Sequence, residues 1–334
     1  MIKKSLQAIM LLGIFIAAPS CNKIPDTNEE LSREDATLTL FFIPSPFGIN
    51  WESPRKLFTS MALNYFSYRP HFMGHVAVQV QCQDLIGQQH RFLTGMTSQK
   101  LAAASAVIFE HAGLGVMFEK NPGKFDDPKK SEQELIYRLK NPGATSGVNF
   151  IQYKINAAAC TRIAKYYQEF KDYNLNRYYG LYSRPLYGEG AGCSAFGASF
   201  IELIGLMNED MKKSWSYTLH LPYNLIGKPF TDNKVYVWEL LKNKQWGIAG
   251  SDAMTFFFWE PDKMYHWVNK TLQNVTQQKN QDSKYQSKKI FNTQGLFVDA
   301  SAITVPNEPI WKKTDRPFFS ELLELNKQLY DSAL

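Results

Sequence analysis

A glycine-rich run that leads into a helix is the feature that most constrains this chain. Residues 188–197 have the sequence GEGAGCSAFG, and Phe196, Phe200 and Ile204 continue at helical spacing behind Cys193. A thiol in the first turn of a helix faces unpaired backbone N–H groups and the positive end of the helix dipole, and both favour the thiolate. The preceding glycines leave space around the sulfur. The pattern favours a nucleophilic thiol over a buried structural cysteine.

His75 is the base that fits this thiol best. Residues 75–82 (HVAVQVQC) alternate, which predicts a strand with the valines on one face and His75 on the other. An imidazole on a strand that faces a helix N-terminus is placed to take the thiol proton. His75 and Cys193 would then form half of a cysteine hydrolase or acyltransferase. An ordinary half-exposed histidine is the alternative for His75, and His220, which follows Cys193 in the chain, is a rival base.

An imidazole base needs a third polar group that fixes its tautomer. Residues 89–96 form the predicted hairpin partner of the histidine strand, and we expect this strand to supply the group. His90 is one candidate. A turn centred near Leu85 would instead bring Thr94 closer to His75, so both residues stay open.

The aromatic loop before the thiol contributes two further candidates. The hydroxyl of Tyr179 can donate a hydrogen bond to a developing oxyanion, alongside the backbone N–H of Cys193, or it can simply pack the loop. Arg184 can bind a substrate carboxylate or remain a solvated surface charge.

The N-terminus is typical of an exported protein. Two lysines precede the apolar stretch 8–18, which is too short to span a membrane, so we expect residues 1–20 to be a signal peptide. The sequence APSC that ends at Cys21 resembles a bacterial lipobox, in which the cysteine carries the lipid. An ordinary small-x-small cleavage site is the alternative. Residues 21–35 would tether the following domain to a membrane.

Composition supports a folded, exported domain and excludes some partners. The 334 residues are 44% hydrophobic and 20% charged, enough for a packed core. Loss of Lys3 and Lys4 with the signal peptide lowers the net charge from +6 to +4. The sequence has no basic stripe of the kind that binds nucleic acid, so we expect no nucleic-acid partner. We expect Cys82 and Cys160 to be small core residues or to pair with each other, and Cys193 to stay free in either case.

The order of elements predicts one α+β core over residues 36–225, followed by a C-terminal extension, 226–334, of unknown role. Further predicted elements are strands over 36–43, 134–139, 148–155 and 296–305, and helices over 53–66, 156–173 and 318–330. We expect neither a cofactor nor a metal. The run HFMGH, residues 71–75, would offer two zinc ligands, but it lacks the glutamate of HExxH and lies at the start of a strand.

These motifs resemble those of the NlpC-type papain-like cysteine hydrolases, which carry a Tyr-x-x-Gly-type loop before an Asp-Cys-Ser helix start. Tyr179-Gly180 and Gly192-Cys193-Ser194 match, with glycine in place of the aspartate. The histidine strand, 74–78, precedes the cysteine here. That order is similar to the circularly permuted branch, with its YiiX-like bacterial proteins and lecithin:retinol acyltransferase-like enzymes. The resemblance covers residues 36–210.

The resemblance implies a papain-like fold with an antiparallel sheet packed on the cysteine helix, and a site of Cys193, His75 and His90. It implies cell-wall peptides or lipid acyl groups as substrates. We therefore expect a lipid-anchored thiol hydrolase of the bacterial cell envelope, facing the periplasm or the exterior and forming an acyl-enzyme on amide bonds. A lipid acyltransferase or esterase, and a non-catalytic envelope scaffold, are the alternatives.

Overall fold

The structure is a computed structural model that describes residues 36–67, 71–99, 102–143, 146–228, 230–277 and 284–325. The predicted signal peptide, the tether and the lipidation site at Cys21 lie outside the described residues. Residues 36–325 belong to one compact unit, to which everything below refers.

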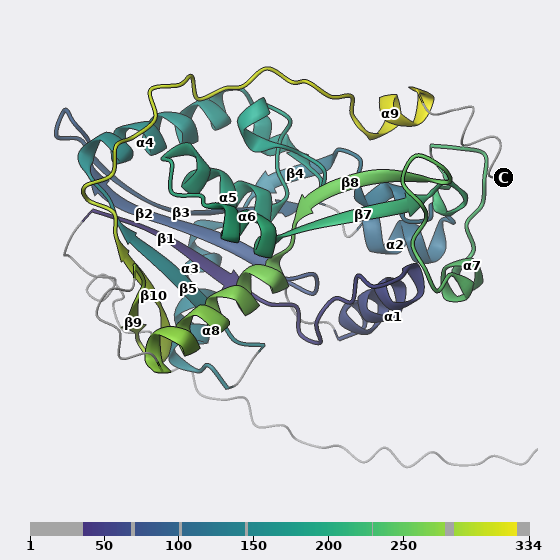
Figure 1. Cartoon of the computed structure of the whole chain (residues 1–334), viewed down its shortest axis with the longest axis horizontal. Helices are drawn as coiled ribbons and strands as arrows, with labels where there is room; N and C mark the ends of the chain where they lie inside the picture. The colour runs from purple at the N-terminus through teal and green to yellow at the C-terminus, as the bar shows by residue number, and fades with distance from the viewer. Residues whose placement is uncertain are drawn as a thin grey trace, which may run out of the picture. The chain divides into compact units, whose positions relative to one another are not determined.

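A mixed sheet of eight described strands organises this unit, in the order β6-β4-β3-β2-β1-β5-β10-β9 (Figure 1). Neighbouring strands are antiparallel, except for the parallel pair of β5 and β10. The fold is therefore α+β, as the sequence predicts. The strands are β1 (Thr37–Ile43), β2 (His75–Gln83), β3 (Gln89–Ser98), β4 (Asn121–Phe125), β5 (Asn149–Lys154), β6 (Tyr178–Tyr179), β9 (Gln286–Ile290) and β10 (Thr293–Asp299).

Helices cover both faces of the central strands, which explains why β1 is buried at every residue. The described helices are α1 (Pro54–Tyr65), α2 (Ala102–Phe109), α3 (Pro128–Lys140), α4 (Ala157–Asp172), α5 (Cys193–Leu203), α6 (Glu209–Trp215), α7 (Val237–Lys242), α8 (Pro261–Gln277) and α9 (Phe319–Leu325). In the largest apolar cluster the valine face of β2 packs against α4 and α5, while α8 packs against β1, β5 and β10. The opposite face, which includes Ala77, packs against α3.

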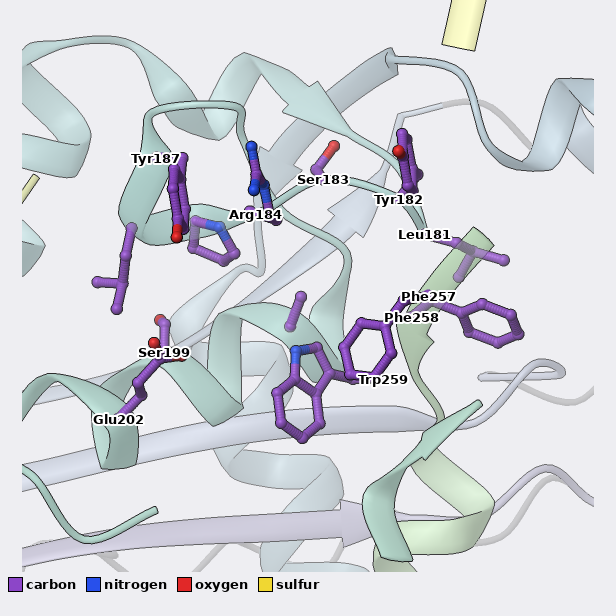
Figure 2. Close-up of a pocket in the computed structure, with 13 residues that line it drawn as sticks. Leu181, Tyr182, Ser183, Arg184, Tyr187, Ser199, Glu202, Phe257, Phe258 and Trp259 are labelled. Atoms are coloured by element: carbon purple, nitrogen blue, oxygen red, sulfur yellow. The ribbon is translucent and has the colours of Figure 1, made fainter. Parts of the chain in front are cut away.

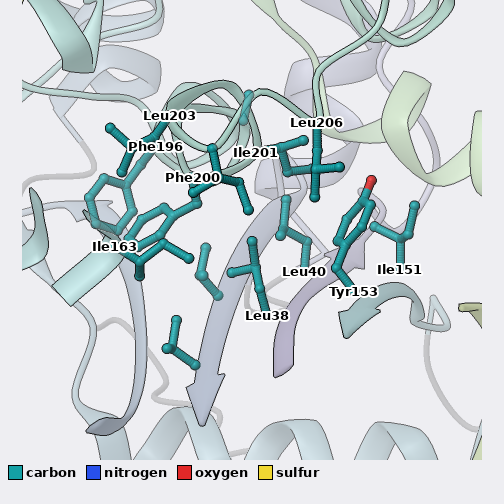
Figure 3. Close-up of a cluster of buried hydrophobic side chains, with 14 of the residues drawn as sticks. Leu38, Leu40, Ile151, Tyr153, Ile163, Phe196, Phe200, Ile201, Leu203 and Leu206 are labelled. Carbon is teal, nitrogen blue, oxygen red and sulfur yellow. The ribbon is translucent and has the colours of Figure 1, made fainter. Parts of the chain in front are cut away.

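Helix α5 lies unusually close to β2. Figure 3 shows Phe196, Phe200 and Ile201 of α5 directed into the cluster that also contains Leu38 and Leu40 of β1. Gly197 makes this approach possible, because a Cβ there would lie 2.5 Å from Val76 Cγ1. The close contact fixes the first turn of α5 against the start of β2.

A disulfide joins Cys82, at the far end of β2, to Cys160 of α4. The interpretation of these cysteines as separate core residues is therefore wrong, and the alternative pairing is the one observed. Both cysteines are buried, and Cys193 is the free cysteine of the described chain. The bond closes a loop across 78 residues and ties the sheet to the helix that covers it.

A second apolar cluster lies beyond the start of β2. The ribbon of β7 (Ser216–Pro222) and β8 (Ala253–Trp259) packs there with α1, α7 and α9. Figure 1 shows these elements together at one end of the unit, next to the end of β1 and the start of β2. Helix α1 has the predicted start, with Ser53 accepting the N–H of Lys56 and Pro54 in the first turn.

The C-terminal residues join the same sheet. β10 pairs with β5, so the predicted boundary at residue 225 does not separate two bodies. After β10 the chain crosses α4 and α5 towards α9 (Figure 1). Along that path Trp311 donates to Glu169 and the Lys312 N–H donates to the carbonyl of Leu186. We call residues 300–318 the strap.

The predicted strand at 134–139 is wrong, because these residues lie within α3. The helix begins after Asp127, whose carboxylate accepts the N–H groups of Lys129 and Lys130, and Pro128 occupies its first turn. Its buried residues Leu135, Arg138 and Leu139 share one helical face. The capping signal therefore outweighs the short apolar run.

Candidate active site

Cys193 is the first residue of α5, in the position that the sequence predicts. Gly192 is the N-cap and offers no side chain to the free N–H groups of the first turn. The Cys193 side chain is 5% exposed, yet it belongs to none of the three apolar clusters of the described chain. Polar side chains, those of Tyr179 and His75, interact with its sulfur.

His75 is the first residue of β2, and its imidazole lies close enough to the Cys193 thiol for each group to shift the pKa of the other. The paired register of β2 and β3 begins at Ala77 opposite Gly95. Ahead of that point, the Val76 backbone N–H is near enough to the Cys193 sulfur to favour its thiolate. The start of α5 thus meets β2 where β3 has parted from it, which brings the sulfur and the imidazole together.

Asp126 is the third group of the site. Its Oδ2 lies 2.8 Å from His75 Nε2, which leaves Nδ1 as the ring nitrogen for the thiol. Asp126 follows β4, and its backbone N–H donates to the carbonyl of Gly95. A side chain at Gly95 would collide with the pair, since its Cβ would lie 2.1 Å from Asp126 Oδ2 and 3.0 Å from His75 Nε2.

The charges of these three groups support one another. Burial alone would lower the pKa of His75, but Asp126 and the Cys193 sulfur more than offset it and raise that pKa to about 10. Burial likewise opposes the thiolate, yet His75, Tyr179 and the Val76 N–H together lower the pKa of Cys193 below its ordinary value. The arrangement favours a thiolate beside an imidazolium.

Tyr179 lies next to the thiol, as expected for an oxyanion or substrate residue. Its hydroxyl donates to Cys193 Sγ over 3.7 Å. Burial and the neighbouring sulfur raise the pKa of Tyr179 well above its ordinary value, so the hydroxyl keeps its proton. A protonated hydroxyl therefore lies beside the sulfur, at the N-terminus of α5.

The hairpin partner does not supply the third group, contrary to the sequence prediction. His90 lies opposite Cys82, at the other end of β2 from His75, and pairs with Asp84 over 2.8 Å. Thr94 lies opposite Val78 on the valine face of the sheet. The group that bonds His75 comes instead from the end of β4, one strand further from β2.

Arg184 is not at the thiol but in a charged cluster between the aromatic loop and the strap. It pairs with Glu189 over 2.8 Å and with Asp315, and its guanidinium stacks on the ring of Tyr187. Glu189 is 3% exposed and also pairs with Arg316. The strap thereby holds the loop that leads into Cys193.

His71 lies beside His75, but the two rings do not converge on a metal. They are stacked, and each Nε2 atom bonds a carboxylate, Glu134 for His71 and Asp126 for His75. Within the described ranges, no cluster of three or more histidine, cysteine, aspartate or glutamate side chains has the geometry of a metal site. The rival base His220 lies on β7 and bonds Thr255 Oγ1 over 2.9 Å.

A cavity of about 160 Å³ lies on the outer side of α5. Figure 2 shows it between the loop 181–187, the α5 residues Ser199 and Glu202, and the aromatic end of β8 at Phe257–Trp259. The Ser194 hydroxyl donates to the carbonyl of Trp259 over 2.8 Å, which joins this end of β8 to the helix start beside Cys193.

Asp126 and Glu134 are the residues that sequence reasoning missed. The only local signal at Asp126 is its place just before the helix start Asp127-Pro128, which locates it at the end of a connection but not near a histidine. The pairing of β4 with β3, which carries Asp126 to the site, joins Met96 to Phe125 and leaves no pattern in the sequence.

Comparison with known proteins found no matching family model, no similar curated protein and no similar solved structure. In the described part of the chain no helix has both the length and the apolar character that crossing a bilayer requires.

Proposed function

We propose that the protein is an exported thiol hydrolase with a permuted papain-like core, in which Cys193 forms an acyl-enzyme. The observation that carries this proposal is the series Asp126, His75 and Cys193 at the N-terminus of α5, in which Asp126 bonds His75 and the imidazole interacts with the thiol. A nucleophile, a base that holds its proton and a group that orients the base are the parts that acyl transfer to sulfur needs.

In the proposed reaction, the Cys193 thiolate attacks the carbonyl carbon of an amide. The carbonyl oxygen gains the negative charge and is stabilised by the Cys193 N–H and the Tyr179 hydroxyl. The His75 imidazolium gives its proton to the leaving amine as the C–N bond breaks, which leaves the acyl group on sulfur. Neutral His75 then takes a proton from water, the hydroxide releases the acid, and the thiolate re-forms.

The covalent structure supports an exported location. Disulfides persist in the periplasm and outside the cell and are rare in the cytosol. A bond between the buried Cys82 and Cys160 therefore fits the predicted signal peptide and the anchor at Cys21. Cell-envelope peptides are the amide substrates that this location offers.

The cavity beside α5 favours a second candidate, an acyltransferase or esterase that acts on lipid acyl groups. Aromatic and aliphatic side chains dominate its lining, among them Leu181, Tyr182 and Trp259. Its volume of about 160 Å³ suits the first few carbons of an acyl chain or one aromatic side chain. An ester substrate would pass through the same acyl-enzyme.

A non-catalytic scaffold is favoured by one observation, the low exposure of Cys193 and His75, each 5%. Reaction of the native protein with iodoacetamide at neutral pH, followed by peptide mass spectrometry, separates this reading from an enzyme. An enzyme is alkylated at Cys193, and His75→Ala slows that reaction strongly. His90→Ala is the matched control, since it removes a carboxylate-paired histidine far from the thiol. Native Cys193 that stays unmodified would exclude the hydrolase.

Substrate class is tested by trapping the acyl group. The protein is incubated with an N-acyl peptide amide or with a p-nitrophenyl acyl ester, and its intact mass is recorded. We expect an adduct of the acyl mass that hydroxylamine removes and that Cys193→Ser abolishes. Faster turnover with peptides supports the hydrolase of the envelope, while adducts from long-chain esters alone support the lipid enzyme.

A further inference from the structure

A second imidazole lies face to face with that of His75. The ring centroids of His71 and His75 are 4.3 Å apart, and the ring planes are within 16° of parallel. His71 comes from the turn before β2, where its backbone has a φ of +56° in the left-handed region. Few residues other than glycine adopt that conformation, and where they do so the surrounding structure fixes it, often at functional sites.

Each stacked ring has its own carboxylate. Glu134 Oε2 lies 3.0 Å from His71 Nε2, as Asp126 Oδ2 does at 2.8 Å from His75. The buried Arg138 donates to the other oxygen of Glu134 and compensates its charge. Burial opposes ionisation of Glu134, but His71 and Arg138 lower its pKa to about 2. Glu134 is therefore a fixed anion that accepts the Nε2–H of His71.

The two rings cannot both carry a proton without strong repulsion at this separation. The groups that face His75 are Asp126 from the end of β4, Cys193 from α5 and His71 from the turn before β2. Burial and the charge on His75 lower the pKa of His71, which leaves it neutral beside the imidazolium. The π face of a neutral aromatic ring attracts a cation placed over it.

We propose that His71 is a positioning residue for His75: anchored by Glu134, its neutral ring supports the imidazolium through face contact and directs it towards Cys193. This inference rests on the proposed function of Cys193 and His75. It adds a residue that touches neither the sulfur nor the substrate, and it explains why Asp126, just before α3, and Glu134, within α3, each bind one imidazole.

The test compares His71→Phe with His71→Leu in the full chain, using the rate of Cys193 alkylation by iodoacetamide from pH 5 to 10. Both variants lose the bond to Glu134, but only phenylalanine keeps an aromatic face. We expect the inflection point of the alkylation rate against pH for His71→Phe to stay within about half a pH unit of that of the parent protein. For His71→Leu it should rise by about one unit, with alkylation at pH 6.5 about fivefold to tenfold slower. His71→Asn, which tolerates the left-handed backbone, should behave like the leucine variant.

Identical profiles for the parent, phenylalanine and leucine proteins would overturn the role of His71, as would equal losses in both variants accompanied by a lower melting temperature. Should His71→Leu fail to fold, Glu134→Gln serves instead, with an expected rise of about half a unit; an unchanged inflection overturns the proposal. Failure of the proposed function is distinguishable, because the parent Cys193 would then not react below pH 8.

Discussion

Asp126 Oδ2 lies 2.8 Å from His75 Nε2, although β4, which Asp126 follows, and β2, which His75 begins, are not neighbours in the sheet. Strand β3 lies between them and carries no side chain at the point of contact, because that position is Gly95. The contact therefore depends on β2 and β4 leaving β3 at adjacent positions, Ala77 opposite Gly95 and Phe125 opposite Met96.

Loss of the Asp126 carboxylate should make the thiol less reactive. Asp126→Asn removes the charge that raises the pKa of His75, so the imidazolium loses its proton at a lower pH and no longer lowers the pKa of Cys193 as strongly. We expect alkylation of Cys193 at pH 7 to slow by about 10- to 100-fold. Asp84→Asn, which removes the carboxylate paired with His90, is the control and should leave the rate unchanged. Equal rates for both variants would count against Asp126.

A methyl group at Gly95 should separate His75 from Asp126. The added Cβ would lie 2.1 Å from Asp126 Oδ2, closer than any real contact, so one side chain must move. We expect Gly95→Ala to lower Cys193 alkylation at neutral pH about as much as Asp126→Asn, with its circular dichroism spectrum unchanged. Gly143→Ala, which meets no atom within 4 Å, is the matched control. A fully reactive Gly95→Ala protein would show that the pair is not required.

The sequence predicts the nucleophile and base positions because both depend on local patterns. A strand beginning at His75 follows from two-residue alternation, and a helix beginning at Cys193 follows from the glycines before it. Asp126 depends instead on the position at which β4 joins β3, a long-range pairing without a local signal. His90 was the wrong choice for the same reason, since hairpin register places it beside Cys82.

The C-terminal third of the chain illustrates a second limit of prediction from the sequence. The strand predicted over 296–305 is right only for residues 296–299 of β10, since residues 300–305 belong to the strap, and the pattern does not say that β10 will lie parallel to β5 in the main sheet. Helix α8 is likewise missing from the sequence prediction. Its apolar residues Met264, Trp267 and Val268 pack against the sheet, but the long polar side chains on its exposed face obscure the helical pattern.

Stability should fall as the pH rises, because of Glu260. This carboxyl is 2% exposed, and burial together with Asp262 raises its pKa to about 8. Unfolded glutamate ionises near pH 4.3, so between that pH and about 8 the folded chain holds a proton that the unfolded chain has lost. Stability is then lost across that window. His75 contributes in the same direction. Its contribution to the free energy of unfolding is present below pH 6.5 and is lost as the pH rises towards about 10.

Glu260→Gln isolates the first effect, since His75 is the same in both proteins. We expect the variant to melt at the parent's temperature at pH 5 and several degrees higher at pH 9, measured by circular dichroism. Glu110→Gln, at an exposed position, is the control and should follow the parent at both pH values. A parent that is as stable as the variant at pH 9 would contradict a neutral, buried Glu260.

Removal of the disulfide should destabilise the protein without silencing the thiol. Its loop of 78 residues corresponds to about 4 kcal/mol of unfolded-state entropy. Cys82→Ala/Cys160→Ala should therefore unfold at a clearly lower urea concentration, and reduction of the parent should have the same effect. Alkylation of Cys193 in the folded variant should stay near the parent rate, since the bond lies at the other end of β2. An unchanged midpoint would refute a stabilising disulfide.

Glu189 should link the strap to the reactivity of Cys193. Its buried carboxylate binds Arg184 and Arg316 and accepts the hydroxyl of Thr314, so it joins the loop before α5 to residues 314–316. Glu189→Gln leaves two guanidinium groups without their shared anion. We expect this to cost about 3 kcal/mol of unfolding free energy, as breaking a buried pair usually does.

The control is Glu202→Gln, which removes a surface pair between α5 and the same strap. Glu202 and Lys312 are more than one-third exposed, so we expect a loss below about 1 kcal/mol. In urea titrations the loss of unfolding free energy in Glu189→Gln should therefore be more than twice the loss in Glu202→Gln. Slower Cys193 alkylation in Glu189→Gln alone would show that the strap holds the loop for the site, whereas equal effects would mean that it only covers α5.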